Sequence, residues 1–242
     1  MARSVRFRTK HGIIVALDGE TVDACKRTVD VTTAVEGVVG YKLGMTTALR
    51  LGLAEAVRQL REHTDLPLLY DHQKAGPDVF DMAAKFAALC AEAKVDGLIL
   101  FPLAGPRAVE SFVGESIKHG ILPLVGGDLP FPDYNISGGG YVADDALERI
   151  IDKAVEAGAN HFVIPGNTPD KLRRHSERLK EKLRAPVFVV PGIGPLGGKI
   201  GDLVAAANGC SVYGVVGRAV YGAADQTAAA RALVDEAMAA AA

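Results

Sequence analysis

Five charged residues stand at or just after the ends of three apolar segments in the first third of the chain: Asp18, Lys42, Asp71, Lys74 and Asp78. Lys42 lies in the otherwise apolar run Val-Val-Gly-Tyr-Lys-Leu-Gly, where a buried lysine needs a counter-charge or a route to solvent. Carboxylates offset the desolvation of a neighbouring ammonium and keep it charged. The pattern therefore predicts a polar reaction centre in which lysines and aspartates share one site.

Glycine-rich turns follow two later apolar segments. One reads Pro191-Gly192-Ile193-Gly194 and the other is Gly217-Arg218. Backbone N–H groups in such turns bind anions, and a guanidinium adds a bidentate contact to phosphate. These residues are our candidate phosphate contacts. Asp128, at the end of another apolar segment, is a further candidate substrate contact.

Some of these charged residues have a structural alternative. Asp18 could cap the helix that follows it, and Arg218 could pair with Asp225 instead of a phosphate. Asp71, Lys74 and Asp78 could form a solvated loop. His72 and Gln73 are expected to serve loop structure rather than catalysis.

Short β-branched or aliphatic runs alternate with helical segments along the whole chain, which predicts parallel strands joined by helices. The expected strands are residues 12–18, 38–44, 66–71, 97–102, 122–126, 161–165, 187–191 and 211–217. Helices are expected in the gaps, among them 46–63, 79–93, 143–157, 169–183 and 227–241. The prediction is a single α/β domain spanning 1–242, a (β/α)8 TIM barrel, with a short, basic, solvated arm at residues 1–10.

A doubly wound open sheet is the alternative architecture. Gly-Glu-Thr-Val-Asp follows Asp18, so the dinucleotide-binding GxGxxG fingerprint does not follow the first strand. This favours the barrel, in which catalytic residues lie at the carboxyl ends of the strands. Residues 129–141, with two prolines and three consecutive glycines, are expected to form a functional loop or lid.

Composition excludes several classes of protein. A formal net charge of −2 gives no global field that would attract nucleic acid. No apolar run reaches the length of a membrane span, so no membrane partner is expected. Cys25, Cys90 and Cys210 are widely spaced in apolar surroundings, which indicates free thiols in a reducing compartment such as the cytoplasm. No histidine or cysteine pair has metal-ligand spacing, so neither a metal nor a cofactor is expected.

Five motifs in order resemble the orotidine 5′-phosphate decarboxylase family over about residues 12–235. They are Leu-Asp18, Lys42-Leu-Gly, the Asp71/Lys74/Asp78 group, Pro-Gly-Ile-Gly at 191–194, and Val-Gly-Arg218-Ala-Val-Tyr. The resemblance implies metal-free decarboxylation of orotidine 5′-phosphate to UMP in de novo pyrimidine biosynthesis. It also implies a homodimer with shared active sites.

The resemblance further implies a role for each matching residue. Asp18 and Lys42 would hold the ribose hydroxyls and begin a charge network that Asp71, Lys74 and Asp78 complete. Lys74 would donate the proton, and Asp78 would come from the neighbouring subunit. Two features depart from the family pattern, since each gap in the Asp71/Lys74/Asp78 group is longer by one residue and Leu196 replaces a phosphate-contacting glutamine.

Two other functions are compatible with these motifs. A magnesium-dependent sugar-phosphate decarboxylase or aldolase of the same superfamily has similar third, seventh and eighth strands, but a metal-binding glutamate on the second strand. Lys42 at that position would repel a cation. The second alternative is a phosphate-ligand-binding barrel without catalysis, suggested by the longer spacing after Asp71 and by Leu196.

Overall fold

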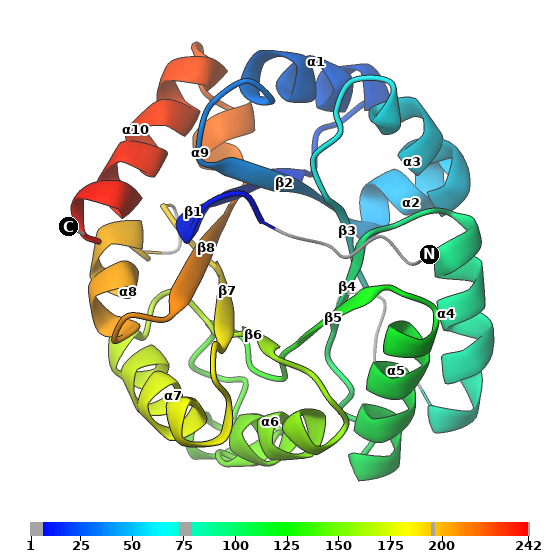
Figure 1. The fold of residues 1–242 in the computed structure, drawn as a ribbon, viewed down its shortest axis with the longest axis vertical. Helices are drawn as coiled ribbons and strands as arrows, with labels where there is room; N and C mark the ends of the chain where they lie inside the picture. Colours follow the sequence, from blue (N-terminus) through cyan, green and yellow to red (C-terminus); the bar gives the residue numbers. More distant parts are fainter. Residues whose placement is uncertain (1–6, 73–78, 195–196, 242) are drawn as a thin grey trace.

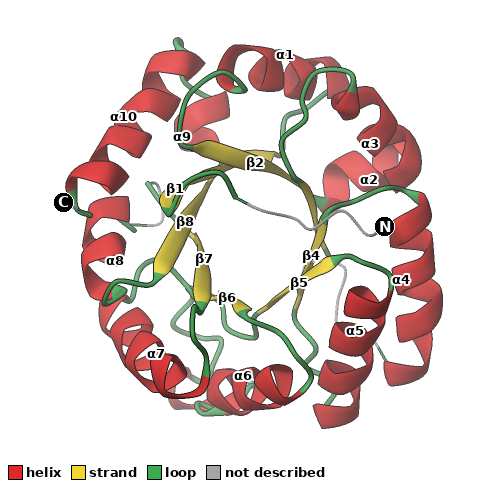
Figure 2. Ribbon diagram, viewed as in Figure 1, coloured by secondary structure: helices red, strands yellow, loops and turns green. Residues whose placement is uncertain are grey.

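The computed structural model describes residues 7–72, 79–194 and 197–241. In these residues eight parallel strands form a closed barrel in chain order, and pairing of the last strand with the first completes the ring. Figures 1 and 2 show the strands at the centre and the helices around them. The predicted (β/α)8 barrel is confirmed, and the open doubly wound sheet is excluded.

The strands and helices alternate along the chain. The strands are β1 (His11–Leu17), β2 (Val38–Leu43), β3 (Leu68–Asp71), β4 (Gly97–Leu100), β5 (Leu122–Val125), β6 (His161–Val163), β7 (Val187–Pro191) and β8 (Ser211–Val216). The α-helices are α1 (Val22–Thr32), α2 (Met45–Leu51), α3 (Leu53–Arg61), α4 (Ala83–Glu92), α5 (Pro106–Lys118), α6 (Ala146–Glu156), α7 (Pro169–Lys182), α8 (Ile200–Ala206), α9 (Arg218–Tyr221) and α10 (Gln226–Ala239). Short 3-10 helices cover Phe80–Met82 (η2) and Ile136–Gly138 (η3).

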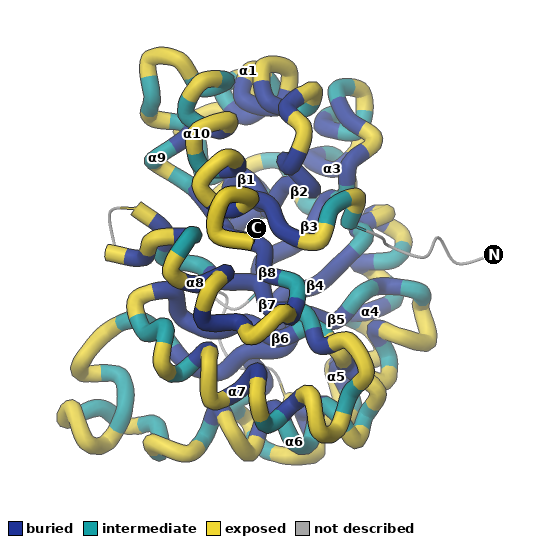
Figure 3. The backbone as a smooth tube through the Cα atoms, turned by 60° about the vertical axis from the view of Figure 1, so that its left-hand side comes forward, coloured by how far each residue is buried: buried dark blue, intermediate teal, exposed yellow. Residues whose placement is uncertain are grey.

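Two hydrophobic clusters lie on the two faces of the sheet. Successive strand residues point to opposite faces, so Ile14 and Ala16 of β1 belong to the inner cluster, whereas Ile13 packs under the helices. Figure 3 shows the strands as mostly buried, and the partly exposed strand residues lie at strand ends. An eight-stranded barrel is just wide enough for side chains to fill it, which leaves the carboxyl ends of the strands as the place for a ligand.

The amino-terminal segment differs from the expected solvated arm. Arg8 and Lys10 are exposed, but the Phe7 ring packs against Tyr213 of β8 with 4.4 Å between ring centroids. The Tyr213 hydroxyl also donates a hydrogen bond of 2.7 Å to the carbonyl of Thr9. Phe7 therefore packs on the inner cluster at the amino ends of the strands, where its ring covers apolar surface.

Two predicted helices begin or divide at other positions than expected. The predicted helix 46–63 is divided into α2 and α3 at Gly52, whose φ of 75° lies outside the helical region. The predicted helix 79–93 becomes η2 followed by α4. The loop 129–141 contains only η3, as its prolines and glycines predict.

Candidate active site

A cavity of about 290 Å³ lies at the carboxyl ends of the strands. Its apolar wall includes Ile99, Phe101, Val163 and Val215, which belong to the inner cluster. The charged residues that line it are Asp18, Lys42, Asp71, Asp128 and Arg218. Residues that the sequence places on five different strand ends are thus brought to one cavity.

Lys42 lies between two carboxylates. The β1–β2 register pairs Ala16 with Lys42, so Asp18 lies two residues further toward the mouth, within reach of the extended lysine side chain. The Lys42 Nζ lies 3.2 Å from Asp18 Oδ1 and 3.2 Å from Asp71 Oδ2. The Lys42 and Asp71 side chains are 4% and 2% exposed, against 30% for Asp18. Two carboxylates, those of Asp18 and Asp71, therefore supply the counter-charge that the buried Lys42 requires.

Local backbone features leave room for this triad. A Cβ on Gly44 would lie 2.4 Å from Asp18 Oδ1, so the carboxylate occupies space that only glycine leaves open. Helix α1 is capped by Thr21, whose side chain accepts a hydrogen bond of 3.1 Å from the Ala24 N–H. Asp18 is consequently not the cap, and its contact is with Lys42.

The loop after β3 is described only as far as His72. The His72 ring packs on Phe86 with 4.3 Å between centroids, and its Nδ1 lies 3.2 Å from the Tyr70 hydroxyl. These contacts agree with a structural role for His72. Lys74 and Asp78, together with Gln73, lie outside the described residues.

The ends of β7 and β8 form the opposite side of the mouth. Pro191, Gly192, Gly217 and Arg218 line the cavity there, and Gly192 has a φ of 97° that favours glycine. Within the described part of the chain Arg218 has no ion-pair partner, and its side chain is exposed. The alternative partner, Asp225, instead caps α10 by accepting a hydrogen bond of 2.9 Å from the Ala228 N–H.

Gly194 differs from the other predicted phosphate contacts. Its N–H donates a hydrogen bond of 2.9 Å to the Gly198 carbonyl, and it is not part of the cavity lining. Its φ of 82° lies in the left-handed region, which glycine adopts without strain. Gly194 therefore shapes the turn after β7, and its amide is already used inside that turn.

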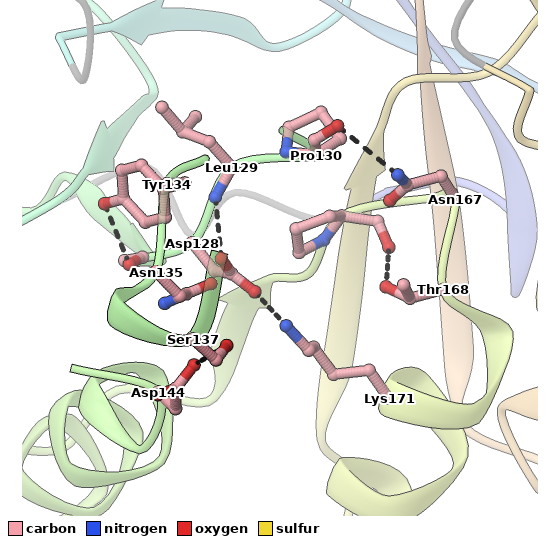
Figure 4. Close-up of polar contacts among 12 residues, drawn as sticks. Asp128, Leu129, Pro130, Tyr134, Asn135, Ser137, Asp144, Asn167, Thr168 and Lys171 are labelled. Carbon is pink, nitrogen blue, oxygen red and sulfur yellow. Dashed lines mark hydrogen bonds and ion pairs between the residues drawn. The ribbon is translucent and has the colours of Figure 1, made fainter. Parts of the chain in front are cut away.

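Asp128 has a partner that the sequence pattern does not reveal. Its carboxylate accepts a hydrogen bond of 2.9 Å from the Leu129 N–H and pairs with the Lys171 ammonium of α7 (Figure 4). The Asp128 side chain is 3% exposed and that of Lys171 28%. A lysine in the first turn of a helix is unfavourable for the helix dipole. This unusual position is the one sequence signal that indicates a specific partner for Lys171.

The loop after β5 is tied back to the barrel near this pair. The Tyr134 hydroxyl donates a hydrogen bond of 3.1 Å to the Gly127 carbonyl, and Asn167 donates one of 3.4 Å to the Pro130 carbonyl (Figure 4). Burial, followed by the nearby Asp128 charge, raises the pKa of Tyr134 to about 12. The phenol thus remains a hydrogen-bond donor, and the loop forms a fixed wall of the cavity.

Three global features bear on the sequence predictions. Cys25, Cys90 and Cys210 are free and buried, as expected. Among residues 7–72, 79–194 and 197–241, no cluster of histidine, cysteine and carboxylate side chains is arranged to hold a metal ion. The helices of that same part of the chain include none with the length and apolar character to cross a bilayer.

Residues 12–233 match the model of the Orotidine 5′-phosphate decarboxylase / HUMPS family. The chain belongs to this family. Among its curated relatives, the orotidine 5′-phosphate decarboxylase of Methanosarcina barkeri (strain Fusaro / DSM 804) is 28% identical over 229 residues, which cover 94% of this chain and 95% of the relative. That of Pyrococcus abyssi (strain GE5 / Orsay) is 27% identical over 226 residues, covering 93% and 98%.

Solved structures of orotidine decarboxylases share the barrel. The enzyme from Methanocaldococcus jannaschii, complexed with the inhibitor BMP, has a TM-score of 0.78 at 20% identity and covers 93% of this chain and 97% of its own. The enzyme from Pyrococcus horikoshii OT3 has a TM-score of 0.76 at 24% identity, covering 93% and 99%. These likenesses establish the fold, and the family match confirms the predicted resemblance to the orotidine 5′-phosphate decarboxylase family.

Proposed function

We propose that this chain decarboxylates orotidine 5′-phosphate to UMP in pyrimidine biosynthesis. The observation that carries the proposal is Lys42, held between Asp18 and Asp71 at the mouth of the barrel, in a chain whose curated relatives bear the name of that enzyme. The cavity also contains Arg218, a cation without a protein partner among the described residues, on the side of β7 and β8.

The substrate would bind with its phosphate toward Arg218 and the turns at Gly192 and Gly217. A guanidinium matches the geometry of a phosphate, and exposed backbone N–H groups add hydrogen bonds. Asp18 and Lys42 would contact the ribose hydroxyls, and the heterocycle would pack on the apolar wall. Binding energy from the remote phosphate then helps to orient the reacting ring.

The chemical step requires one bond cleavage and one proton. The bond between C6 and the carboxylate breaks, its electron pair remains on C6, and CO2 leaves. The carbanion at C6 then takes a proton from the Lys74 ammonium, which solvent restores. An ammonium kept charged by Asp71 and Asp78 stabilises the developing negative charge before it transfers the proton. The roles of Lys74 and Asp78 come from the sequence pattern alone.

The reaction proposed here needs no metal. Lys42 occupies the position between Asp18 and Asp71 where a cation would otherwise be attracted, and its own charge repels one. This arrangement disfavours the magnesium-dependent sugar-phosphate alternative.

The assembly proposed is a homodimer in which Asp78 completes the site of the partner subunit. Sharing a site across a two-fold interface makes the isolated protomer inactive. The three buried free thiols favour the cytoplasm, because a reducing compartment keeps such cysteines unpaired.

The test is the loss of the ultraviolet band of orotidine 5′-phosphate when the protein is added. We expect turnover by the wild type, none by Lys74→Ala, and full turnover by Lys85→Ala, which removes an exposed lysine on α4. Nucleotide binding without turnover by the wild type would instead support the non-catalytic barrel. Near-normal activity of Lys74→Ala would contradict the proton-donor assignment.

A further inference from the structure

We propose that Thr47 is a positioning residue of the active site, because its buried hydroxyl holds the end of β1 where the Asp18 carboxylate meets Lys42. The inference rests on the proposed function and deepens it by naming a group that orients the charge network. Thr47 does not line the cavity. Its effect on the reaction is therefore exerted through Asp18 and not through the substrate.

The carbonyl group at the end of β1 accepts hydrogen bonds from two helices. The Thr47 hydroxyl of α2 donates one of 3.0 Å to the Leu17 oxygen, and the Cys25 thiol of α1 donates one of 3.6 Å. Both donor side chains are buried. Burial raises the pKa of the Cys25 thiol, so this group remains protonated. An S–H group is a weak donor, and the Thr47 hydroxyl is therefore the stronger of the two contacts.

The Leu17 carbonyl belongs to the same peptide unit as the Asp18 backbone. This unit is planar, and its six atoms include the Leu17 oxygen and the Asp18 Cα. A hydrogen bond that fixes the oxygen therefore restricts rotation of the whole unit, and with it the direction in which the Asp18 side chain leaves the backbone. Because β1 ends at Leu17, Asp18 itself lies outside the strand. The contacts of the Leu17 oxygen thus set the start of the segment that carries Asp18.

Asp18 is the member of the triad that burial constrains least. Its side chain is 30% exposed, against 2% for Asp71, so water competes for its oxygens. Both Asp18 oxygens nevertheless lie close to the ammonium, at 3.2 and 3.3 Å from Lys42 Nζ. Holding an accessible side chain in one geometry costs conformational entropy. A backbone that is already fixed next to Asp18 reduces this cost and keeps the carboxylate on Lys42.

Thr47 also links the two segments that carry this ion pair. It lies in α2, the helix that follows the strand of Lys42, and its hydroxyl reaches back to the strand that precedes Asp18. The same two strand ends are neighbours in the sheet, where Leu17 pairs with Leu43. The hydroxyl therefore ties the β2–α2 segment to the end of β1 at the level where the lysine and the carboxylate meet.

A threonine that only stabilises the fold is the alternative, and the chain provides two matched controls. Thr46 precedes Thr47 in α2 and is exposed. Thr28 is buried like Thr47, but its hydroxyl donates a hydrogen bond of 3.1 Å to the Ala24 carbonyl within α1. Replacing either control threonine with valine makes the same chemical change and leaves the contacts of the Leu17 carbonyl in place.

The experiment is a double-mutant cycle in kcat/KM for orotidine 5′-phosphate, with Thr47→Val and Asp18→Asn made singly and together. Thr47→Val should lower kcat/KM by roughly three- to tenfold, the effect of one hydrogen bond, and Thr47→Ser should restore it. In the Asp18→Asn protein, Thr47→Val should change kcat/KM by less than about twofold, because the carboxylate that it positions is already absent. Thr46→Val and Thr28→Val should keep the wild-type kcat/KM. The same cycle in the affinity for UMP, measured by calorimetry, decides the matter if Asp18→Asn turns over too slowly.

Equal losses from Thr47→Val in the wild-type and Asp18→Asn proteins would overturn the inference and leave the decarboxylase proposal intact. A loss in Thr28→Val as large as that in Thr47→Val would do the same. A wild type that does not consume orotidine 5′-phosphate would overturn the decarboxylase proposal instead.

The positioning role can be tested without substrate by running the same cycle in urea unfolding. Thr47→Val should then lower the free energy of unfolding less in the Asp18→Asn protein than in the wild type, because part of its effect is the weakened contact between Asp18 and Lys42. Equal decreases would overturn the positioning role. Thermal unfolding checks that each variant is folded, and Thr47→Ala takes the place of Thr47→Val in the cycle if the valine variant does not fold.

Discussion

Replacing Lys42 with methionine removes the cation from between Asp18 and Asp71 while keeping a side chain of similar length. Both carboxylates then face each other without a counter-charge from β2. Asp71 is 2% exposed and cannot be rehydrated in place, whereas Asp18 is 30% exposed and can recover part of its hydration. We therefore expect Lys42→Met to be destabilised mainly through Asp71.

The magnitude follows from the burial of the pair. Removing one partner of a buried ion pair costs on the order of 3–5 kcal/mol, and the exposure of Asp18 favours the lower end, about 3 kcal/mol. For a chain of this size such a loss lowers the melting temperature by roughly 6–12 °C. The double variant Lys42→Met/Asp71→Asn, which also neutralises the buried carboxylate on β3, should be more stable than Lys42→Met alone.

Urea unfolding followed by circular dichroism measures these differences, and turnover should be lost in both variants. Lys118→Met is the control, because Lys118 forms an exposed pair with Glu115 at 3.1 Å and its loss should cost no more than about 1 kcal/mol. A loss below about 1 kcal/mol in Lys42→Met, or a double variant less stable than the single one, would show that Lys42 does not stabilise the fold through Asp71.

Arg218→Ala should raise the KM for orotidine 5′-phosphate by at least roughly tenfold and leave a substrate without the phosphate little affected, because the role proposed for the guanidinium is contact with the phosphate alone. Steady-state kinetics on both substrates distinguishes this from a general loss. Burial, followed by the nearby Arg178 charge, lowers the pKa of His175 from 6.5 to about 4. His175 is therefore neutral in the fold. The free energy of unfolding does not depend on its titration above pH 6.5, and it decreases by up to roughly 3 kcal/mol as the pH falls from 6.5 toward 4. In urea unfolding measured between pH 4 and pH 7, His175→Gln should lose less stability on acidification than the wild type. The same loss in both proteins would contradict the assignment. Activity should survive exhaustive chelation, and a loss that magnesium restores would move the protein to the sugar-phosphate branch. Subunit exchange between Lys74→Ala and Asp78→Ala proteins should return roughly a quarter of wild-type activity, because half of the dimers are mixed and each carries one intact site; verified exchange without recovery would place Asp78 in its own barrel or outside the site.

The barrel could be predicted because its signals are local. Each strand is a short apolar run that ends in a charged or glycine-rich turn, and the carboxyl ends of all strands meet at one mouth. Asp18, Lys42 and Asp71 could be grouped on this basis alone. The sequence does not predict the break at Gly52, because a single glycine is tolerated within a helix pattern, and only its φ of 75° shows that the helix ends there.

The contacts that could not be predicted depend on tertiary structure. Lys171 lies 43 positions from Asp128 in the chain, and nothing in its own segment indicates which carboxylate it meets. Gly194 matches a phosphate-binding motif, yet in the folded chain its N–H donates a hydrogen bond to the Gly198 carbonyl. The sequence predicts that Phe7 belongs to a solvated basic arm, because its partner, Tyr213, is on the last strand.

Decarboxylation with protonation at C6 can be measured by incubating the protein with orotidine 5′-phosphate in D2O and analysing the products by mass spectrometry and proton NMR. We expect equimolar CO2 and UMP, with one solvent deuterium at C6 of the UMP, because the donating ammonium exchanges with solvent. Unchanged orotidine 5′-phosphate, or CO2 release without deuterium at C6, would contradict it.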